Sequence, residues 1–192
     1  MERFSNTNVT KPLREKIDPD RIDFRRLSQK CPREAFCCGN EHINDFFRRT
    51  ALSDHTSLDC RVVTAHLDED EQAVAFYAMR IGFEPESELI HDQGFFSKLA
   101  SKVQSRLVIT LQLSWVAVHN DWRRRGIGTL LMGHALDNFY NFADSAGVIA
   151  LTLKPIDSNA RTFYTGLGFV EYGGASCKII GRADYIYNIT IQ

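Results

Sequence analysis

The sequence lacks several features that would assign it to particular classes of protein. Its net charge is only −1, so no overall attraction to nucleic acid or to a membrane surface is expected, and any basic site must be local. No apolar run reaches the length of a membrane span, and no apolar stretch follows the N-terminal charges as it would in a signal peptide. Internal repeats and low-complexity tracts are missing as well. These absences predict a soluble, cytoplasmic protein that does not bind membranes.

Paired cysteines are also lacking. The chain has five cysteines, an odd number, and their spacing matches no paired set of metal ligands. Two of them, Cys37 and Cys38, are adjacent in the sequence. The pattern favours reduced thiols over a disulfide framework or a zinc site, so no metal is expected.

The composition that is present is that of an ordinary globular protein. Of the 192 residues, 44% are hydrophobic and 24% are charged, and this length suits one domain with a sizeable core. Residues 1–20 are polar and irregular, which predicts a flexible N-terminal arm. Residues 21–192 are predicted to form a single domain.

Hydrophobic periodicity predicts both helices and strands along this domain. Helical spacing of apolar residues predicts helices over 41–55, 126–146 and 157–167. Apolar and β-branched runs predict strands over 60–67, 73–83, 106–119, 148–153 and 184–191. An acidic turn at 68–72 would join two strands into a hairpin, and residues 97–107 are consistent with a short basic helix. The order predicts an α/β (α+β) fold around a mixed central sheet.

The segment RRRGIGTLL, residues 123–131, lies between the predicted central strand and the helix that follows it. Backbone amides at a helix N-terminus lack partners within the helix and carry partial positive charge, so they can bind an anion. Gly126 and Gly128 have no side chain, which lets a phosphate approach the main chain closely. The three arginines before them add positive charge. The combination predicts a loop that binds a diphosphate.

Two well-known nucleotide-binding motifs do not match this loop. The dinucleotide fingerprint G-x-G-x-x-G would need glycine at position 131, where the chain has Leu131. A P-loop would need Gly-Lys-Ser/Thr after a four-residue gap, which is missing too. On the loop alone, a solvated basic start of a helix is as good an interpretation as a diphosphate site.

A second motif gives the loop its context. The pattern R-x-x-G-x-G at 123–128 resembles the acetyl-CoA pyrophosphate loop of the GNAT acetyltransferase superfamily, and NARTFYTGLGF at 159–169 is similar to the superfamily's A-x-x-F-Y-x-x-x-G-F signature. Both occur in the expected order and separation, within about residues 113–170. The resemblance implies the GNAT fold, with a mixed central β-sheet that is splayed at the acetyl-CoA site and flanked by helices. It also implies an N-acetyltransferase that uses acetyl-CoA as cosubstrate.

Further segments resemble the GNAT toxins that acetylate aminoacyl-tRNA in type II toxin–antitoxin systems. AFCCGNEHINDFFRRTAL at 35–52 is similar to the beginning of those toxins, and AVAFYAMRIG at 73–82 is similar to one of their strands. IDSNARTFY at 156–164 is similar to their I-D-x-x-A-R-x-F-Y. This resemblance implies a charged tRNA as acceptor, inhibition of translation and an antitoxin protein that covers the active site. Many relatives are dimers, so a homodimer is a further expectation.

The resemblance also implies roles for individual residues. Backbone groups of Val116, Ala117 and Val118 would pair with the pantetheine arm of the cofactor like an added strand. A bulge or splay of the sheet there would open the slot and offer an amide to the thioester carbonyl. The other residues expected to bind the cofactor are Arg123, Arg124, Arg125, Gly126, Gly128, Thr129 and Asn159.

Tyr164 is predicted to be the general acid, because a phenol beside the CoA sulfur can donate its proton to the departing thiolate. The alternative is a tyrosine that only packs beside Phe163. The sequence identifies no general base, and water can carry the proton of the amine. A tRNA acceptor would need a positive surface, for which the candidates are Arg48, Arg49, Lys98, Lys102, Arg106 and the arginines at 123–125.

Two alternatives to a tRNA-acetylating toxin stay open. The enzyme could acetylate a small amine, an amino acid or a protein terminus, and dependence of the activity on RNA would separate these acceptors. The chain could also be a CoA-binding module without catalysis that acts through a protein partner. The presence of Tyr164, Gly126 and Gly128 argues against the second alternative.

Overall fold

The structure is a computed structural model that describes residues 15–85, 107–148, 150–172 and 176–180. The strand predicted over 184–191 lies outside the described residues. The basic helix predicted over 97–107 lies outside them as well, except for its last residue.

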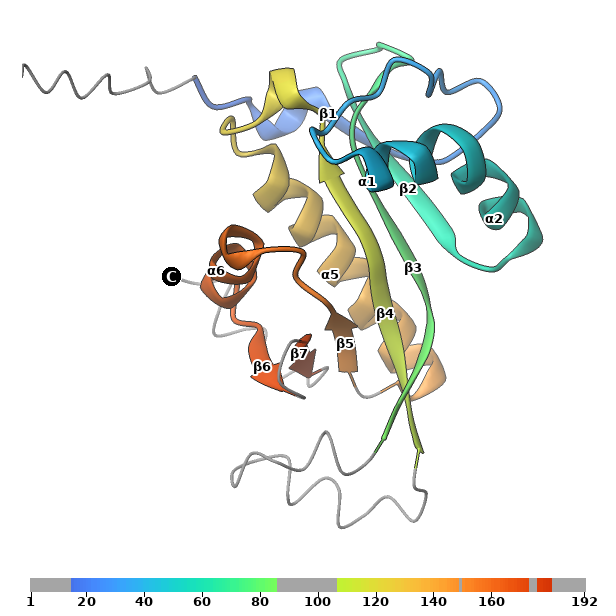
Figure 1. Cartoon of the computed structure of the whole chain (residues 1–192), viewed down its shortest axis with the longest axis vertical. Coiled ribbons are helices and arrows are strands. Elements are labelled where there is room, and N and C mark those ends of the chain that lie inside the picture. Colours follow the sequence, from blue (N-terminus) through green and yellow to red (C-terminus); the bar gives the residue numbers. More distant parts are fainter. Residues whose placement is uncertain (1–14, 86–106, 149, 173–175, 181–192) are drawn as a thin grey trace, which may run out of the picture.

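A seven-stranded mixed sheet, in the order β1-β2-β3-β4-β5-β7-β6, forms the centre of the fold (Figure 1). Neighbouring strands are antiparallel except β4 and β5, which run parallel. The predicted hairpin is confirmed as β2–β3 and the predicted central strand as β4, whereas β1, β6 and β7 are additional to the predicted strands. The strands are β1 (Ile22–Arg26), β2 (Arg61–Leu67), β3 (Ala73–Pro85), β4 (Leu107–Val118), β5 (Ala150–Leu153), β6 (Val170–Tyr172) and β7 (Ser176–Ile180).

Helices form where the apolar spacing predicts them. Residues 41–57 make one helical stretch with a π-helical turn at Phe46–Thr50 in its middle. The Asp157 side chain caps α6 by accepting a hydrogen bond from the Ala160 amide at 2.7 Å, and Gly147 ends α5 in the left-handed conformation. The helices are α1 (Glu41–Asp45), α2 (Ala51–Ser57), α5 (Ile127–Ala146) and α6 (Ser158–Gly166), with 3₁₀ turns at Pro19–Arg21 and Asn120–Trp122.

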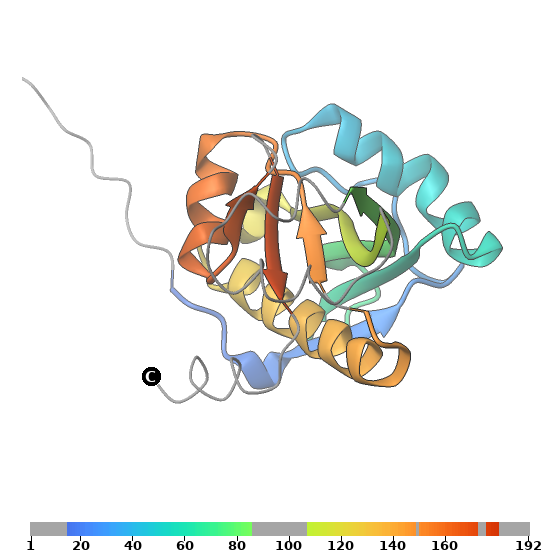
Figure 2. The same ribbon diagram turned by 90° about the horizontal axis from the view of Figure 1, so that it is seen from below.

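The helices cover both faces of the sheet (Figure 2). On one face, α5 buries a row of apolar side chains at helical spacing, which includes Ile127, Leu131 and Phe139. On the other face, α1 and the residues that follow it pack aromatic rings against the sheet. There Phe47 stacks on Phe76 of β3, with ring centroids 4.2 Å apart. The core therefore consists of two apolar clusters, one on each side of the sheet.

Two irregularities in β4 shape the site. The register between β3 and β4 shifts at a β-bulge, where Ser114 is an extra residue without a partner on β3. On its other edge, β4 pairs with β5 only through Leu111–Leu113. The predicted splay of the sheet is thus present, and it begins at the bulge.

The described end of the predicted N-terminal arm is attached to the domain. The Ile17 amide donates a hydrogen bond to the Arg125 carbonyl at 2.9 Å, and the Ile17 side chain packs against the α5-side core. Ile17 therefore contacts the domain, although it lies inside the predicted arm. Residues 1–14 lie outside the described residues.

Candidate active site

The C-terminal half of β4 has an open edge where the sheet splays. β5 ends at Leu153, which pairs with Leu113, and the chain then leads into α6. Val116, Ala117 and Val118 pair with β3, and no other described strand lies on their opposite edge. That edge is therefore open to an extended ligand that offers hydrogen-bonding groups.

The loop after β4 turns on residues in the left-handed conformation. Arg124 has a φ of 62° and Gly126 a φ of 85°. A Cβ atom on Gly126 would meet nothing within 4 Å, so the space beside its backbone is open. α5 begins directly afterwards at Ile127 and has no side-chain cap. The Thr129 amide donates to the Gly126 carbonyl at 3.0 Å, so the amides before it are the ones left without a capping side chain. The start of α5 is therefore open beside Gly126, where the sequence predicts an anion-binding helix N-terminus.

The three arginines of this loop have different surroundings. Arg124 is exposed, and the Arg125 guanidinium lies 4.9 Å from the centroid of the Trp122 ring. Arg123 already has partners, because its guanidinium donates hydrogen bonds to the Val118 carbonyl at 3.5 Å and to the Cys38 carbonyl. None of the three forms an ion pair with another residue in the described part of the chain. Arg124 and Arg125 are therefore the positive charges left for an anion beside the glycines.

α6 brings Tyr164 to the same region. The helix packs on the loop, since a Cβ atom on Gly128 would lie 3.6 Å from the Phe163 ring and 3.9 Å from the Val118 side chain. Tyr164 belongs to the α5-side core, with ring contacts to Phe163 at 5.3 Å and to Phe169 at 5.8 Å. The two sequence motifs thus meet at the open edge of β4.

Two buried tyrosines in this core differ at their hydroxyl groups. The Tyr77 hydroxyl accepts a hydrogen bond from Asn138 Nδ2 at 2.9 Å and lies 3.1 Å from His134 Nδ1. The Tyr164 hydroxyl has no hydrogen-bond partner among the residues that the structure describes. Desolvation is the largest of the causes that raise the pKa of Tyr164 to about 12. Tyr164 therefore stays protonated at neutral pH and keeps its hydroxyl available as a donor to a ligand.

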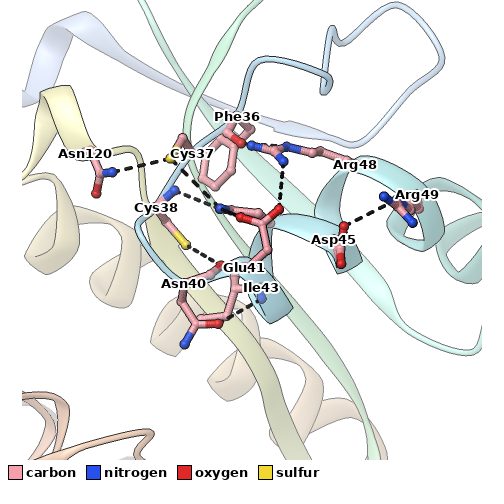
Figure 3. Close-up of polar contacts among 11 residues, drawn as sticks. Phe36, Cys37, Cys38, Asn40, Glu41, Ile43, Asp45, Arg48, Arg49 and Asn120 are labelled. Atoms are coloured by element: carbon pink, nitrogen blue, oxygen red, sulfur yellow. Dashed lines mark hydrogen bonds and ion pairs between the residues drawn. The ribbon is translucent and has the colours of Figure 1, made fainter.

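A loop that precedes α1, residues 36–40, lies against the start of the arginine loop (Figure 3). Asn120 Nδ2 donates to Cys37 Sγ at 3.4 Å or, with the amide turned over, to the Cys38 carbonyl at 3.2 Å. The backbone amide of Asn120 donates to the Cys37 carbonyl at 2.8 Å. Gly39 has a φ of 76°, and a Cβ atom there would lie 3.2 Å from Asn120 Oδ1. The loop 36–40 is thus held at the end of β4 by contacts that neither sequence motif reveals.

α1 and the π-helical turn after it place aromatic rings beside the bulge. Trp115 follows Ser114, the extra residue of the bulge. Its ring stacks on Phe46 with ring centroids 4.5 Å apart, and it lies 5.1 Å from the His42 ring in an edge-on contact. The Asn44 side chain accepts a hydrogen bond from the Cys38 amide at 2.8 Å and joins the helix to loop 36–40. Because Trp115 directly precedes residues 116–118, these side chains lie beside the open part of β4. His42, Asn44 and Phe46 lie in the segment 35–52 that resembles the GNAT toxins, but the sequence assigns them no individual role.

Two of the arginines predicted to form a tRNA surface are paired within their own helix (Figure 3). Arg48 forms an ion pair with Glu41 at 3.1 Å, and Arg49 forms one with Asp45 at 3.3 Å. Their charge is therefore partly compensated, whereas the arginine loop keeps unpaired charge. The remaining candidates, Lys98, Lys102 and Arg106, lie outside the described residues.

The described part of the chain holds neither a cluster of metal-ligating side chains nor a long apolar helix. No three His, Cys, Asp or Glu side chains gather there in a way that could hold a metal ion. No described helix is long and apolar enough to cross a membrane. The cysteines are free thiols.

Comparison with known proteins agrees with this geometry. Residues 89–171 match the family described as acetyltransferase (GNAT) domain. A tRNA-acetylating toxin of Mycobacterium tuberculosis is 28% identical over 149 residues, which cover 76% of this chain and 82% of the toxin.

Solved structures share the fold. AtaT complexed with acetyl-methionyl-tRNAfMet has a TM-score of 0.78 at 18% identity, with 87% of this chain and 99% of that chain covered. A mutant of KacT has a TM-score of 0.77 at 14% identity, with 89% and 98% covered. AtaTR bound with AcCoA has a TM-score of 0.72 at 18% identity, with 90% and 98% covered.

The splayed sheet, the glycine loop and the tyrosine of α6 define an acetyltransferase of the GNAT type. Residues 89–171, which match the GNAT acetyltransferase domain family, include both the glycine loop and Tyr164, and the chain shares the fold of the AtaT and KacT structures. The predicted fold and the predicted acetyltransferase activity are thereby confirmed.

Proposed function

We propose that this acetyltransferase transfers the acetyl group of acetyl-CoA to the amino group of an aminoacyl-tRNA and so acts as a toxin that blocks translation in the cytoplasm. The observation that carries the proposal is the open edge of β4 between the glycine loop and Tyr164, which fits an acetyl-CoA thioester. The acceptor is supported by similarity to a tRNA-acetylating toxin over most of both chains. Structures with the same fold hold an acetylated methionyl-tRNA in one case and acetyl-CoA in another.

The cofactor would lie along β4 and reach the N-terminus of α5. Its pantetheine amides would pair with the backbone of residues 116–118. Its pyrophosphate would accept hydrogen bonds from the amides of residues 126–128 and from the guanidinium groups of Arg124 and Arg125. Such charge-assisted hydrogen bonds contribute about 1.5–3 kcal/mol each, so this part of the site would supply much of the affinity.

The other residues expected at the cofactor would have unequal roles. Thr129 and Asn159 are exposed in the first turns of α5 and α6, where a hydroxyl and an amide would add hydrogen bonds to the cofactor. Arg123 would act indirectly, because its guanidinium is bonded to the Cys38 carbonyl. We therefore expect Arg123 to position loop 36–40 rather than to bind phosphate.

The reaction would take place beside the bulge. The neutral amine attacks the thioester carbonyl, so that a C–N bond forms and the C–S bond breaks. The amine gives up one proton and the CoA thiolate receives one. Because Ser114 interrupts the pairing of β3 with β4, a backbone amide at the bulge could donate to the carbonyl oxygen as negative charge develops on it.

Tyr164 would serve the leaving sulfur. Its hydroxyl is protonated at every physiological pH because burial raises its pKa to about 12. A thiol has a pKa of about 8.5, so proton transfer from Tyr164 alone would be uphill. We therefore expect the hydroxyl to donate a hydrogen bond to the developing thiolate and to pass on the proton that the amine releases. Positioned donors of this kind contribute about 10²–10⁴-fold to the rate.

Label transfer from radioactive acetyl-CoA tests the function. The purified chain would be offered total aminoacylated tRNA, deacylated tRNA, and a mixture of polyamines and amino acids in separate reactions. We expect label only on aminoacylated tRNA, with release of free CoA in equal amount. Nuclease treatment followed by recovery of acetyl-aminoacyl-adenosine would locate the label on the amino group.

The controls separate the alternatives. Label on small amines without dependence on RNA would contradict the tRNA acceptor and leave an acetyltransferase of another specificity. Binding of CoA without any label transfer would contradict catalysis as a whole. In cells, growth arrest by the wild-type chain and normal growth with Tyr164→Phe would link the chemistry to the toxic effect.

An antitoxin partner follows from the same proposal. Structures of AtaT include a toxin bound to the C-terminus of the antitoxin AtaR. A partner that covers the open edge of β4 would block the cofactor or the acceptor. Restoration of growth by a small protein encoded next to this chain would support that expectation.

A further inference from the structure

Arginines of this chain differ in whether they have an acidic partner. Three of them, Arg26, Arg61 and Arg80, form no ion pair with a described residue and line a single groove. Unpaired arginines also gather in the glycine loop, where an anionic cofactor is expected. The paired arginines elsewhere are Arg21 with Asp68, Arg25 with Asp23, Arg48 with Glu41, Arg49 with Asp45 and Arg161 with Glu171.

The groove combines this positive charge with an apolar floor. Its volume is about 370 Å³, within the range of ligand-binding clefts. Met79 and Leu111 lie in its floor, and Phe142 of α5 lines its side. No Asp or Glu is among the described residues that line it. Two lining residues show that charges of both signs lie near the groove. Desolvation and then the charges of Arg61 and Arg26 lower the pKa of His55, whereas desolvation and then the charges of Asp54 and Asp59 raise the pKa of Cys60.

An apolar strip, made of Ile81, Phe83, Leu107 and Ile109, continues from the groove along β3 and β4. Phe83 pairs with Ile109 and Ile81 with Leu111 of the groove, so these side chains share one face of the two strands. Their exposed fractions are 46%, 62%, 55% and 52% in the order given. β3 and β4 reach past the other strands at this end of the sheet (Figure 1). Exposed apolar side chains that adjoin in this way mark a contact surface for another molecule.

The charges and the strip together select the kind of occupant. A second copy of the chain, bound through the same surface, would set two groups of arginines against each other without acids to pair them. A nucleic acid would use the arginines but would leave the apolar strip uncovered. A small anion would fill only the groove. A protein segment with both carboxylates and apolar side chains satisfies every part of the surface.

We propose that the groove and the apolar strip bind an acidic, apolar segment of a partner protein. Its carboxylates would pair with Arg26, Arg61 and Arg80, where a guanidinium can bind a carboxylate through two hydrogen bonds. Its apolar side chains would pack on Phe142 and along the strip. None of these residues belongs to the glycine loop, to residues 116–118 or to α6, so the surface is separate from the acetyl-transfer site.

A random-peptide library displayed on phage tests the proposal on the full chain. Phage would be selected on the wild type after depletion on the double variant Arg61→Glu with Arg80→Glu. We expect the retained peptides to combine Asp or Glu with Leu, Ile or Phe. A synthetic peptide of the recovered sequence would bind the wild type and lose at least about tenfold in affinity with the double variant, and its affinity would fall with added salt.

Matched variants keep the test decisive. Arg21→Glu makes the same charge change at an exposed arginine outside the groove and should leave peptide affinity unchanged. Phe83→Ser removes an exposed apolar contact and should weaken peptide binding without any change of charge and with only a small change of melting temperature. Recovery of no acidic consensus, or equal affinity for wild type and double variant, would overturn the proposal.

Two other results would also overturn it in favour of a different occupant. A change in sedimentation of the double variant, without loss of peptide binding, would assign the surface to a second copy of the chain. A loss of tRNA affinity, again without loss of peptide binding, would assign it to nucleic acid. Acetyl transfer to a saturating acceptor should stay at the wild-type rate in every variant. The test of this surface is therefore independent of the test of the catalytic function.

Discussion

The two halves of β4 are incomplete in different ways. From Ser114 to Val118 the strand lacks a neighbour on one edge, because β5 has already ended, and open backbone groups remain. From Leu107 to Ile109 the backbone pairs with β3, but apolar side chains are exposed. An open backbone edge suits a ligand that forms hydrogen bonds, whereas an exposed apolar face suits a protein surface. Substitutions in or beside the two halves should therefore change different properties.

The largest effect is expected from Tyr164→Phe, which removes a hydroxyl beside the open edge. We expect kcat for acetyl transfer to fall by about a hundredfold or more, while the Kd for acetyl-CoA stays within about twofold. Steady-state kinetics and calorimetry measure the two quantities. Tyr77→Phe is the matched control, because its hydroxyl is bonded inside the core, and it should cost about 1 kcal/mol of stability without a comparable loss of kcat. A similar loss of kcat in both variants would contradict a special role of Tyr164.

The second largest effect is expected from Gly126→Ala. Its φ of 85° is unfavourable for a side chain, by about 1–2 kcal/mol, and the new methyl group would stand beside the anion site. We expect the Kd for acetyl-CoA to rise about tenfold. Gly133→Ala in α5 is the control, since a Cβ atom there also meets nothing within 4 Å, but the residue is helical. It should stabilise the protein by up to about 1 kcal/mol and leave cofactor binding unchanged.

Arg124→Ala and Arg123→Ala compare two neighbours with different surroundings. Arg124→Ala should weaken acetyl-CoA binding about fivefold, and this loss should shrink as salt is added. Arg123→Ala should instead raise the KM for the acceptor, because loop 36–40 loses its bond through the Cys38 carbonyl. Titration of both substrates in kinetics would show the split. Equal losses of acetyl-CoA affinity would mean that both arginines bind phosphate.

A smaller effect concerns pH. The Tyr164 hydroxyl is protonated below its pKa, and burial raises that pKa from 10.0 to about 12. The rate should therefore show no falling limb from this group between about pH 9 and pH 11, where an ordinary tyrosine would ionise. A kcat profile over this range checks the expectation. Loss of activity with a midpoint near pH 10.0, the ordinary value, would show that the hydroxyl is not desolvated as described.

The smallest effect on the enzyme itself is expected beside the other half of β4, where Phe83 of β3 pairs with Ile109. Phe83 is exposed, so Phe83→Ser should change the free energy of unfolding by no more than about 0.5 kcal/mol. Acetyl transfer should be unaffected, because the residue is remote from the glycine loop in the sheet register. Thermal melting and label transfer would measure both. A loss of activity would show that the two halves of β4 are coupled.

The sequence predicts the parts of the fold that carry strong periodicity or a motif. The helix after the glycine loop appears in the pattern because Ile127, Leu131 and Phe139 recur on one face. Tyr164 and the glycines are found because they lie in motifs with fixed spacing. β1, β6 and β7 are not predicted, because these short strands mix charged or polar residues with apolar ones, whereas the equally short β5 lies in a nearly unbroken apolar run.

The rest of the site depends on tertiary register. The bulge at Ser114 and the end of the β4–β5 pairing arise from how three strands align, which no local pattern records. The contact of Arg123 with Cys38 joins residues far apart in the chain, so three adjacent arginines that look equal in the sequence have unequal surroundings. The groove at Arg61 and Arg80 escapes the sequence for the same reason. Its arginines come from different strands and are distinguished only by the absence of acidic partners among the described residues.

A structure of the chain with a non-hydrolysable acetyl-CoA analogue tests the central claim most directly. The account predicts the pyrophosphate on the amides of residues 126–128, the pantetheine along residues 116–118, and the sulfur within hydrogen-bond distance of the Tyr164 hydroxyl. Arg123 should keep its bond to the Cys38 carbonyl. An analogue bound away from the open edge of β4, or with its sulfur out of reach of Tyr164, would contradict the assignment of this edge as the place of acetyl transfer.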